Sequence, residues 1–144
     1  MVVLFAGLAV FVGMAIATQT LFSGTLGHYV GVMESVFIVH LGGFLVSGVY
    51  LLAARGGNLA AWRAAPVYVW LLAGALGVVI VGGYSYIVPR IGLAPAITVA
   101  VSAQLAFSAV LSHFGALGAV QQPLTLSRGV GIAVLLLGTW LIVR

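Results

Sequence analysis

Residues 31–54 read GVMESVFIVHLGGFLVSGVYLLAA, and this stretch decides the class of fold. Glu34 is the only acidic residue among the 144 residues of the chain, and it lies here with His40 in an otherwise apolar run. The run is longer than the ~20 apolar residues that a helix needs to cross the hydrocarbon of a bilayer. We therefore predict a transmembrane helix that carries two ionisable side chains.

The composition of the whole chain agrees with this prediction. Hydrophobic residues make up 64% of the sequence and charged residues 4%, whereas a soluble domain carries about 25% charged residues. The five arginines are scattered and form no basic patch, so nucleic acid is excluded as a partner. The chain has no Cys, and its three His are too far apart for metal-ligand spacing. We predict an integral membrane protein with no metal and no cofactor.

Five apolar segments are long enough to span the membrane as helices. They cover residues 2–20, 30–53, 66–87, 93–114 and 128–143, and together they predict one all-α domain over residues 1–144. The alternating pattern of a membrane β-barrel is absent from the sequence. The polar, Gly-rich residues 19–29 are interpreted as a connection, and residues 84–95 as a tight turn. Ala15-Ile-Ala17 resembles a signal-peptidase site, but no basic residue precedes it, so a retained first helix is expected.

An odd number of helices places the two ends of the chain on opposite sides of the membrane. Arg55, Arg63 and Arg128 fall on the side of the N-terminus, and Arg90 and Arg144 on the other. This near-balance gives little orientation under the positive-inside rule, so the chain either inserts both ways or depends on a partner. Five helices also suit one half of an inverted-repeat transporter whose second half is another subunit.

The depth of the polar groups suggests a site. At 1.5 Å per residue, a second helix starting near residue 30 puts Glu34 about 6 Å and His40 about 15 Å inside the membrane. Gln104 reaches the midplane in the same way on the fourth helix, at the depth where transporters bind substrate. Helical spacing groups two stripes around these residues: Met33, Phe37, His40, Phe44 and Ser47 on the second helix, and Gln104, Ser108 and Ser112 on the fourth. The predicted substrate- and proton-binding residues are Glu34, His40, Gln104, Phe37 and Ser108.

Each of these residues also has a structural interpretation. Glu34 could extend to the lipid headgroups from a helix end, and His40 could donate to a backbone carbonyl. Gln104 could bond a neighbouring helix, and Ser108 its own backbone. The stripe that contains Phe37 could serve packing alone.

Four motifs carry a resemblance to a known family: residues 82–95 (GGYSYIVPRIGLAP), 99–104 (VAVSAQ), 112–115 (SHFG) and 123–131 (PLTLSRGVG). With residues 19–31, they resemble the YdcZ-type family of the drug/metabolite transporter superfamily. The resemblance implies a five-helix protein of the bacterial cytoplasmic (inner) membrane, similar to one half of the ten-helix members. Such a half would work as an antiparallel homodimer or with a paralogous five-helix partner. Glu34 and His40 depart from the neutral, small or apolar segment found in many members. Small multidrug exporters of the superfamily use a membrane Glu for proton coupling, which is an analogy at the level of fold.

Two functions follow as hypotheses. In the first, the chain is a subunit of a secondary transporter, and Glu34, His40 and Gln104 surround a cavity shared between two subunits. Proton coupling would follow if Glu34 gave up its proton only when facing water, and its charge would favour a small organic cation in contact with Phe37. In the second, the chain is a non-transporting scaffold or regulatory subunit that uses Glu34 for assembly. An enzyme is not expected, because the sequence lacks a second acid, a Cys and any nucleophile–base pair.

Overall fold

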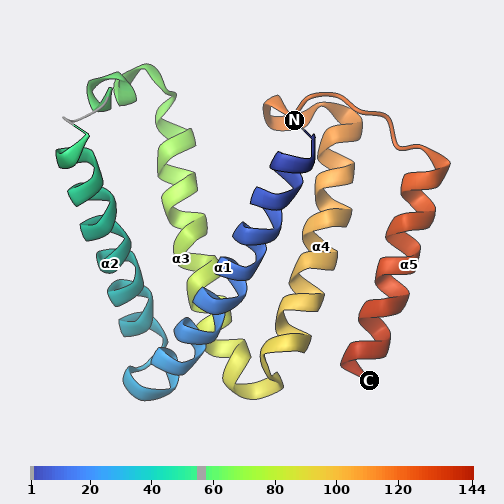
Figure 1. Cartoon of the computed structure of the whole chain (residues 1–144), viewed down its shortest axis with the longest axis horizontal. Helices are drawn as coiled ribbons and strands as arrows, with labels where there is room; N and C mark the ends of the chain where they lie inside the picture. Colours follow the sequence, from blue (N-terminus) through green and yellow to red (C-terminus); the bar gives the residue numbers. More distant parts are fainter. Residues whose placement is uncertain (1, 55–57) are drawn as a thin grey trace. The chain divides into compact units, whose positions relative to one another are not determined.

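The computed structural model describes residues 2–54 and 58–144, which are helical and contain no strand (Figure 1). The membrane-length helices are α1 (Val2–Val30), α2 (Val32–Ala53), α3 (Val67–Ile91), α4 (Leu93–Phe114) and α5 (Leu126–Val143). Two short 3-10 helices, η1 (Leu59–Ala64) and η2 (Ala116–Gly118), lie in the connections. All five long helices are apolar enough to cross a membrane, which confirms the predicted fold class. Arg55, which entered the charge balance, lies outside the described residues.

Two predicted connections are wrong. Residues 19–29 continue α1 as helix to Val30, and within it Thr25 Oγ1 donates to the Leu21 carbonyl oxygen, 2.9 Å away. A hydroxyl satisfied in this way does not end a membrane helix. Helix α3 likewise continues past residue 87 through Pro89 to Ile91. Of the turn expected over residues 84–95, only Gly92 is not helical.

Single glycines connect the helices at both of these places. Gly31, with φ 102°, separates α1 from α2, and Gly92, with φ 87°, separates α3 from α4. These φ values lie in the left-handed region, which glycine adopts without the steric cost that a side chain carries. Glycine therefore permits a connection of one residue between long helices.

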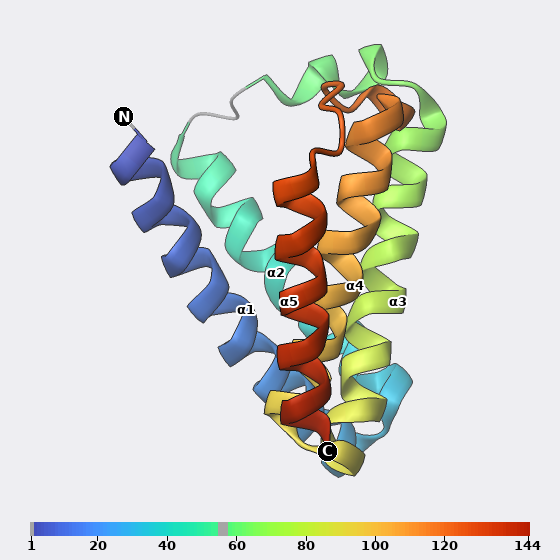
Figure 2. The ribbon, with the colours of Figure 1, turned by 90° about the vertical axis from the view of Figure 1, so that its right-hand side faces the viewer.

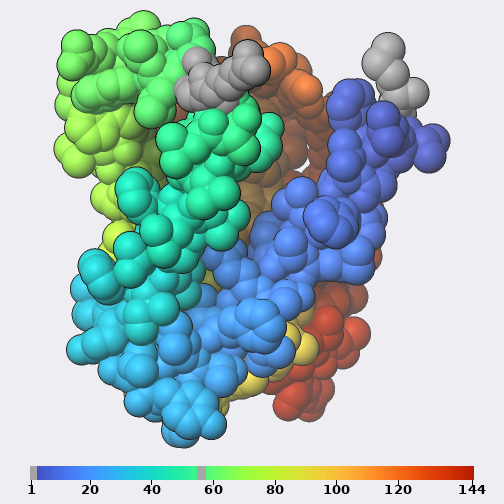
Figure 3. All heavy atoms as spheres, turned by 60° about the vertical axis from the view of Figure 1, so that its left-hand side comes forward, coloured from blue at the N-terminus to red at the C-terminus, as the bar shows by residue number. Residues whose placement is uncertain are grey.

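The chain forms two compact units, residues 1–90 and 91–144, which are described separately. In the first unit, α1 and α2 pack together near their connection and diverge toward the start of α1 and the end of α2 (Figures 1 and 3). The buried residues of these helices and of α3 are small: Thr20, Ser23, Ser35, Val36, Val81, Ser85 and Val88. The large apolar side chains point outward, as expected for helices that contact lipid tails and each other through small residues.

In the second unit, α4 and α5 run side by side and are joined by residues 115–125 (Figure 2). The hydroxyls of Ser102 on α4 and Thr139 on α5 are hydrogen-bonded to each other across this pair. Thr125 is the N-cap residue of α5, and its Oγ1 accepts a hydrogen bond from the backbone N–H of Arg128 at 3.4 Å. A side-chain oxygen at this position satisfies one of the free N–H groups of a helix N-terminus.

Candidate functional site

Three serines join the helices of the first unit next to the only acidic residue. Ser35 Oγ donates to the backbone carbonyl of Ser23 on α1 at 3.1 Å, and it lies 3.0 Å from Ser85 Oγ on α3. The Ser35 side chain is 0% exposed. We call Ser23, Ser35 and Ser85 the serine node. Because each hydroxyl in an apolar surrounding needs a partner, the node specifies how these three helices meet.

Glycines bring α1 against α3 beside the serine node. A Cβ added at Gly24 would lie 2.7 Å from Val88 Cβ, and one at Gly27 would lie 2.8 Å from the Ser85 carbonyl oxygen. That carbonyl has no helical donor four residues on, because position 89 is a proline without an N–H. Gly27 thus allows α1 to approach a carbonyl of α3 that lacks the usual donor four residues later.

Glu34 occupies the first turn of α2 with an exposed side chain, directly before Ser35. Its carboxylate is turned toward Gly31, where an added Cβ would collide with Oε2. The partial positive charge of a helix N-terminus stabilises a carboxylate at this place. Since α2 starts at Val32 rather than near residue 30, Glu34 lies about 3 Å along the helix, and its depth in the membrane stays a prediction.

His40 lies near the middle of α2 and turns toward α3. Its Nδ1 is 2.8 Å from the Val36 carbonyl oxygen and must therefore donate to it. An added Cβ at Gly77 of α3 would lie 3.1 Å from Nε2, so the second ring nitrogen faces this glycine. The geometry corresponds to the predicted alternative of a histidine that donates to a carbonyl, and it leaves Nε2 free to accept a proton. Phe37, one turn earlier, is 67% exposed.

Gln104 and Ser108 belong to the second unit, whereas Glu34, Phe37 and His40 share α2 in the first. Gln104 lies in the middle of α4, as predicted from the start of that helix at Leu93, and its side chain is exposed. Ser108 Oγ donates to the Leu105 carbonyl oxygen at 2.9 Å. The cavity expected to be surrounded by Glu34, His40 and Gln104 stays a prediction.

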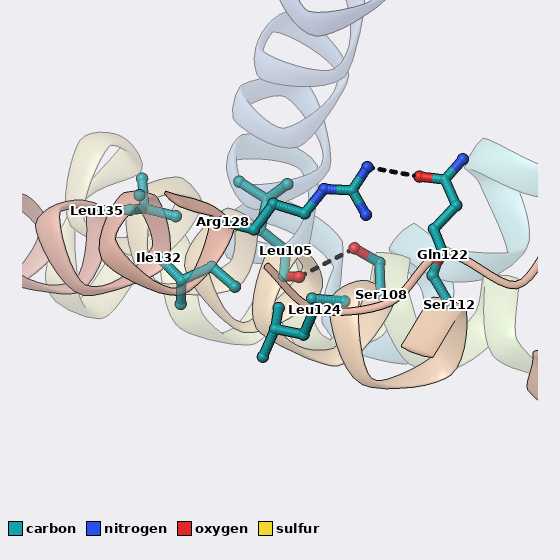
Figure 4. A pocket seen from close by; sticks show the side chains of 10 residues that line it. Leu105, Ser108, Ser112, Gln122, Leu124, Arg128, Ile132 and Leu135 are labelled. Atoms are coloured by element: carbon teal, nitrogen blue, oxygen red, sulfur yellow. Dashed lines mark hydrogen bonds between the residues drawn. The ribbon is translucent and has the colours of Figure 1, made fainter. Parts of the chain in front are cut away.

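A cavity of about 540 Å³ lies between α4 and α5 (Figure 4). Its polar lining comes from Ser108, Ser112, Gln122 and Arg128, and the remainder is largely apolar. Arg128 Nη2 donates to Gln122 Oε1 at 2.8 Å, and Nη1 donates to the Pro123 carbonyl oxygen at 3.3 Å. Ser108, a predicted site residue, therefore lines a cavity. The charged residue of this cavity is Arg128, which is not among the predicted site residues.

The loop that carries Gln122 is bound to the end of α4. The backbone N–H of Gln122 donates to the Ser112 carbonyl oxygen at 2.8 Å, and that of Leu124 donates to His113 Nδ1 at 3.1 Å. Gly115, with φ 62°, ends α4 in the left-handed conformation common at helix C-termini. The SHFG motif of residues 112–115 thus holds the loop that lines the cavity with Gln122 and Leu124, and its Ser112 lines the cavity itself.

The serine node and the cavity role of Arg128 were not predicted from the sequence. A signal for the node existed in Thr20, Ser23, Gly24 and Gly27, which follow helical spacing and form a small-residue face. The expectation of a connection over residues 19–29 concealed it. In the sequence, Arg128 enters only the charge balance between the two sides of the membrane and the motif of residues 123–131.

Comparison with known proteins gives one family. The family model described as "Putative inner membrane exporter, YdcZ" matches residues 4–141. No curated protein and no solved structure gives a significant match. The matched residues include every predicted site residue, the serine node and the cavity of the second unit.

Proposed function

Because this chain belongs to the YdcZ family of inner membrane exporters, we propose that it is one half of a proton-coupled transporter for a small organic solute. Membership makes the chain a multi-pass protein of the cytoplasmic (inner) membrane and a transporter rather than an enzyme. The coupling ion, the solute and the subunit arrangement are the proposed part.

The observation that carries the proposal is the exposure of Glu34 in a membrane-spanning helix. A carboxylate facing hydrocarbon is costly, so such groups are normally covered by protein or lie in a water-filled cavity. Gln104 is exposed in the middle of α4 and needs the same cover. A second subunit would supply it for both residues.

We propose that this second subunit is an antiparallel copy of the chain or a paralogous five-helix protein. The near-balance of arginines on the two sides of the membrane supports insertion in both orientations. The diverging halves of α1 and α2 also carry glycines with open space in front of them: Gly7, Gly13, Gly42, Gly43 and Gly48. Helices associate closely in membranes through such small residues.

Proton coupling is assigned to Glu34 and His40. Glu34 would bind a proton or a cationic solute, but not both, which couples the two fluxes. His40 can accept a proton at Nε2 without giving up the bond from Nδ1 to Val36. Phe37, exposed on the same helix, would contact an organic cation through its ring face.

Proteoliposomes loaded with a pH-sensitive dye test this mechanism. A panel of small quaternary ammonium and guanidinium cations is added outside, and solute-dependent proton movement is recorded. Glu34→Gln should abolish proton movement, while the dimer can still be cross-linked. Arg63→Gln, in η1 between α2 and α3, should leave proton movement unchanged. Normal coupled flux in Glu34→Gln rejects the mechanism. If neither wild type alone nor wild type with a paralogue moves solute, the scaffold function takes its place.

The absence of native Cys permits a direct test of orientation. Single cysteines at Ala61, in η1, and at Leu117, in η2, are both exposed and are expected on the same side of the membrane. Labelling of each from both sides with an impermeant reagent is the result expected for an antiparallel homodimer. Labelling from one side only would reject dual topology and require an oppositely oriented paralogue.

A further inference from the structure

We propose that the cavity between α4 and α5 binds an anionic amphiphile, with its phosphate or carboxylate head at Arg128 and its apolar tail between the helices. This site lies in the second unit and has the opposite charge to Glu34. It is therefore additional to the proposed site for an organic cation.

The charge of the chain favours anions as ligands. The sequence has five arginines and a single glutamate, so its side chains leave a net charge of +4 that no carboxylate side chain of the same chain neutralises. Three of the described arginines lie over aromatic rings, as interfacial residues commonly do: Arg63 over Trp62, Arg90 over Tyr86 and Arg144 over Trp140. Arg128 differs from these three because it lines a cavity.

The guanidinium of Arg128 is held in place by neutral groups. Gln122 Oε1 and the Pro123 carbonyl accept from its two terminal nitrogens. A guanidinium has five N–H donors, so these two bonds orient it and leave donors for a ligand. The loop that presents both acceptors is itself bound to Ser112 and His113. Such preorganisation lowers the entropic cost of binding an anion.

The cavity has a polar end and an apolar end. Arg128 and Gln122 lie at the end formed by the loop, and Leu105, Ile132 and Leu135 line the part farther along the helices (Figure 4). Non-helical backbone needs water or protein partners, so the loop marks the membrane surface. Leu105 is nine residues from the end of α4 at Phe114, or about 14 Å toward the midplane. The cavity is thus polar near the membrane surface and apolar toward the midplane, as is a lipid or another amphiphile inserted in the bilayer.

The size of the cavity also fits such a ligand. Its volume of about 540 Å³ lies within the roughly 300–1,000 Å³ typical of small-molecule sites. Gly131 lines it on α5, and a Cβ added there meets no atom within 4 Å. A larger residue at Gly131 would therefore fill the apolar part of the cavity and leave Arg128 in place.

Octyl phosphate, as a soluble anionic amphiphile, is the probe for binding to the purified protein in an uncharged detergent. Calorimetry should show saturable binding to wild type and about tenfold weaker binding to Arg128→Gln, because charge-assisted hydrogen bonds are lost. Arg63→Gln is the matched control and should bind within about twofold of wild type, since an exposed interfacial charge contributes little. Octyltrimethylammonium, with the same tail and a cationic head, should not displace octyl phosphate from the protein.

Gly131→Leu tests the contribution of the apolar tail to binding separately from that of the charged head. It should weaken octyl phosphate about tenfold by occupying the apolar part of the cavity, with no need to alter any charged group. Equal octyl phosphate affinity in wild type, Arg128→Gln and Gly131→Leu would overturn the proposal, as would displacement of octyl phosphate by octyltrimethylammonium. These outcomes do not depend on solute flux, so they are independent of the proposed coupling by Glu34.

Two sources of the anion are distinguished by further arms of the experiment. If the natural ligand is a lipid, native mass spectrometry of protein from phosphatidylglycerol vesicles should show a retained lipid that Arg128→Gln loses. If it is a transported solute, octyl phosphate inside phosphatidylcholine vesicles should exchange with labelled octyl phosphate outside, and Arg128→Gln should abolish the exchange. Either result supports the anionic site, and failure of both arms overturns it.

Discussion

Gly27→Ala tests whether the close contact of α1 with α3 stabilises the first unit. The new Cβ would lie 2.8 Å from the Ser85 carbonyl oxygen and 2.9 Å from Ser85 Cβ. Because the nearest atom belongs to the backbone, one helix must shift, and overpacking of this kind costs about 1–3 kcal/mol. Alanine also gains about 1 kcal/mol over glycine as a helix former. The net change in the free energy of unfolding is therefore a loss of about 0–2 kcal/mol.

Gly74→Ala on α3, which is not among the glycines proposed to contact a second subunit, is the control that isolates the packing contribution. It makes the same gain in helix propensity, but its Cβ meets no atom within 4 Å. The difference between the two variants should thus equal the overpacking cost of about 1–3 kcal/mol. Reversible unfolding in mixed micelles with increasing dodecyl sulfate, followed by circular dichroism, measures both. Equal stability of the two variants, within about 0.5 kcal/mol, would refute the tight contact at Gly27.

The remaining predictions use the same kind of pairing. Ser35→Ala should lower the free energy of unfolding by about 1–3 kcal/mol in that assay, because it leaves buried polar partners unsatisfied. Ser47→Ala should change it little, since the exposed Ser47 only bonds its own helix; equal effects of the two would contradict the serine node. Gly77→Ala places a Cβ 3.1 Å from His40 Nε2 and should slow proton-coupled flux more than Gly74→Ala, whose Cβ meets open space. Identical flux in these two variants would remove His40 Nε2 from the coupling mechanism.

The sequence predicted the ends of a spanning helix well where these ends coincide with a change from apolar to polar residues. Helix α4 starts and ends where its apolar run does, at Leu93 and Phe114. Helix α1 was predicted ten residues too short, because the polar content of residues 19–29 was interpreted as exposure to water. Ser23 is polar but buried between helices, as small polar residues in membrane proteins often are. A count of polar residues therefore cannot distinguish a connection exposed to water from a helix face that packs against another helix.

The site was predictable only where a residue is rare. Glu34 and His40 stand out in any apolar run, and both lie in α2 as predicted. Ser35 does not stand out, because its role depends on two partners, 12 and 50 residues away in the chain, that only the helix packing brings together. Arg128 likewise acquires its cavity through a loop held by His113, which helical periodicity does not describe.

The position of the serine node suggests how the first unit would work in a dimer. The node joins α1, α2 and α3 near one end, while the other halves of α1 and α2 diverge and leave their glycines free of contacts. We expect these diverging halves to move against a partner, because few contacts within the unit hold them. Glu34 is adjacent to Ser35 and therefore belongs to the fixed end, so the moving halves would change its access to water rather than its position. It follows that Ser35→Ala should reduce stability and coupled flux together, whereas Glu34→Gln should abolish flux and lower the free energy of unfolding by no more than about 1 kcal/mol, the contribution of a carboxylate at a helix N-terminus. A Ser35→Ala variant with reduced stability but full coupling would separate the node from the transport mechanism.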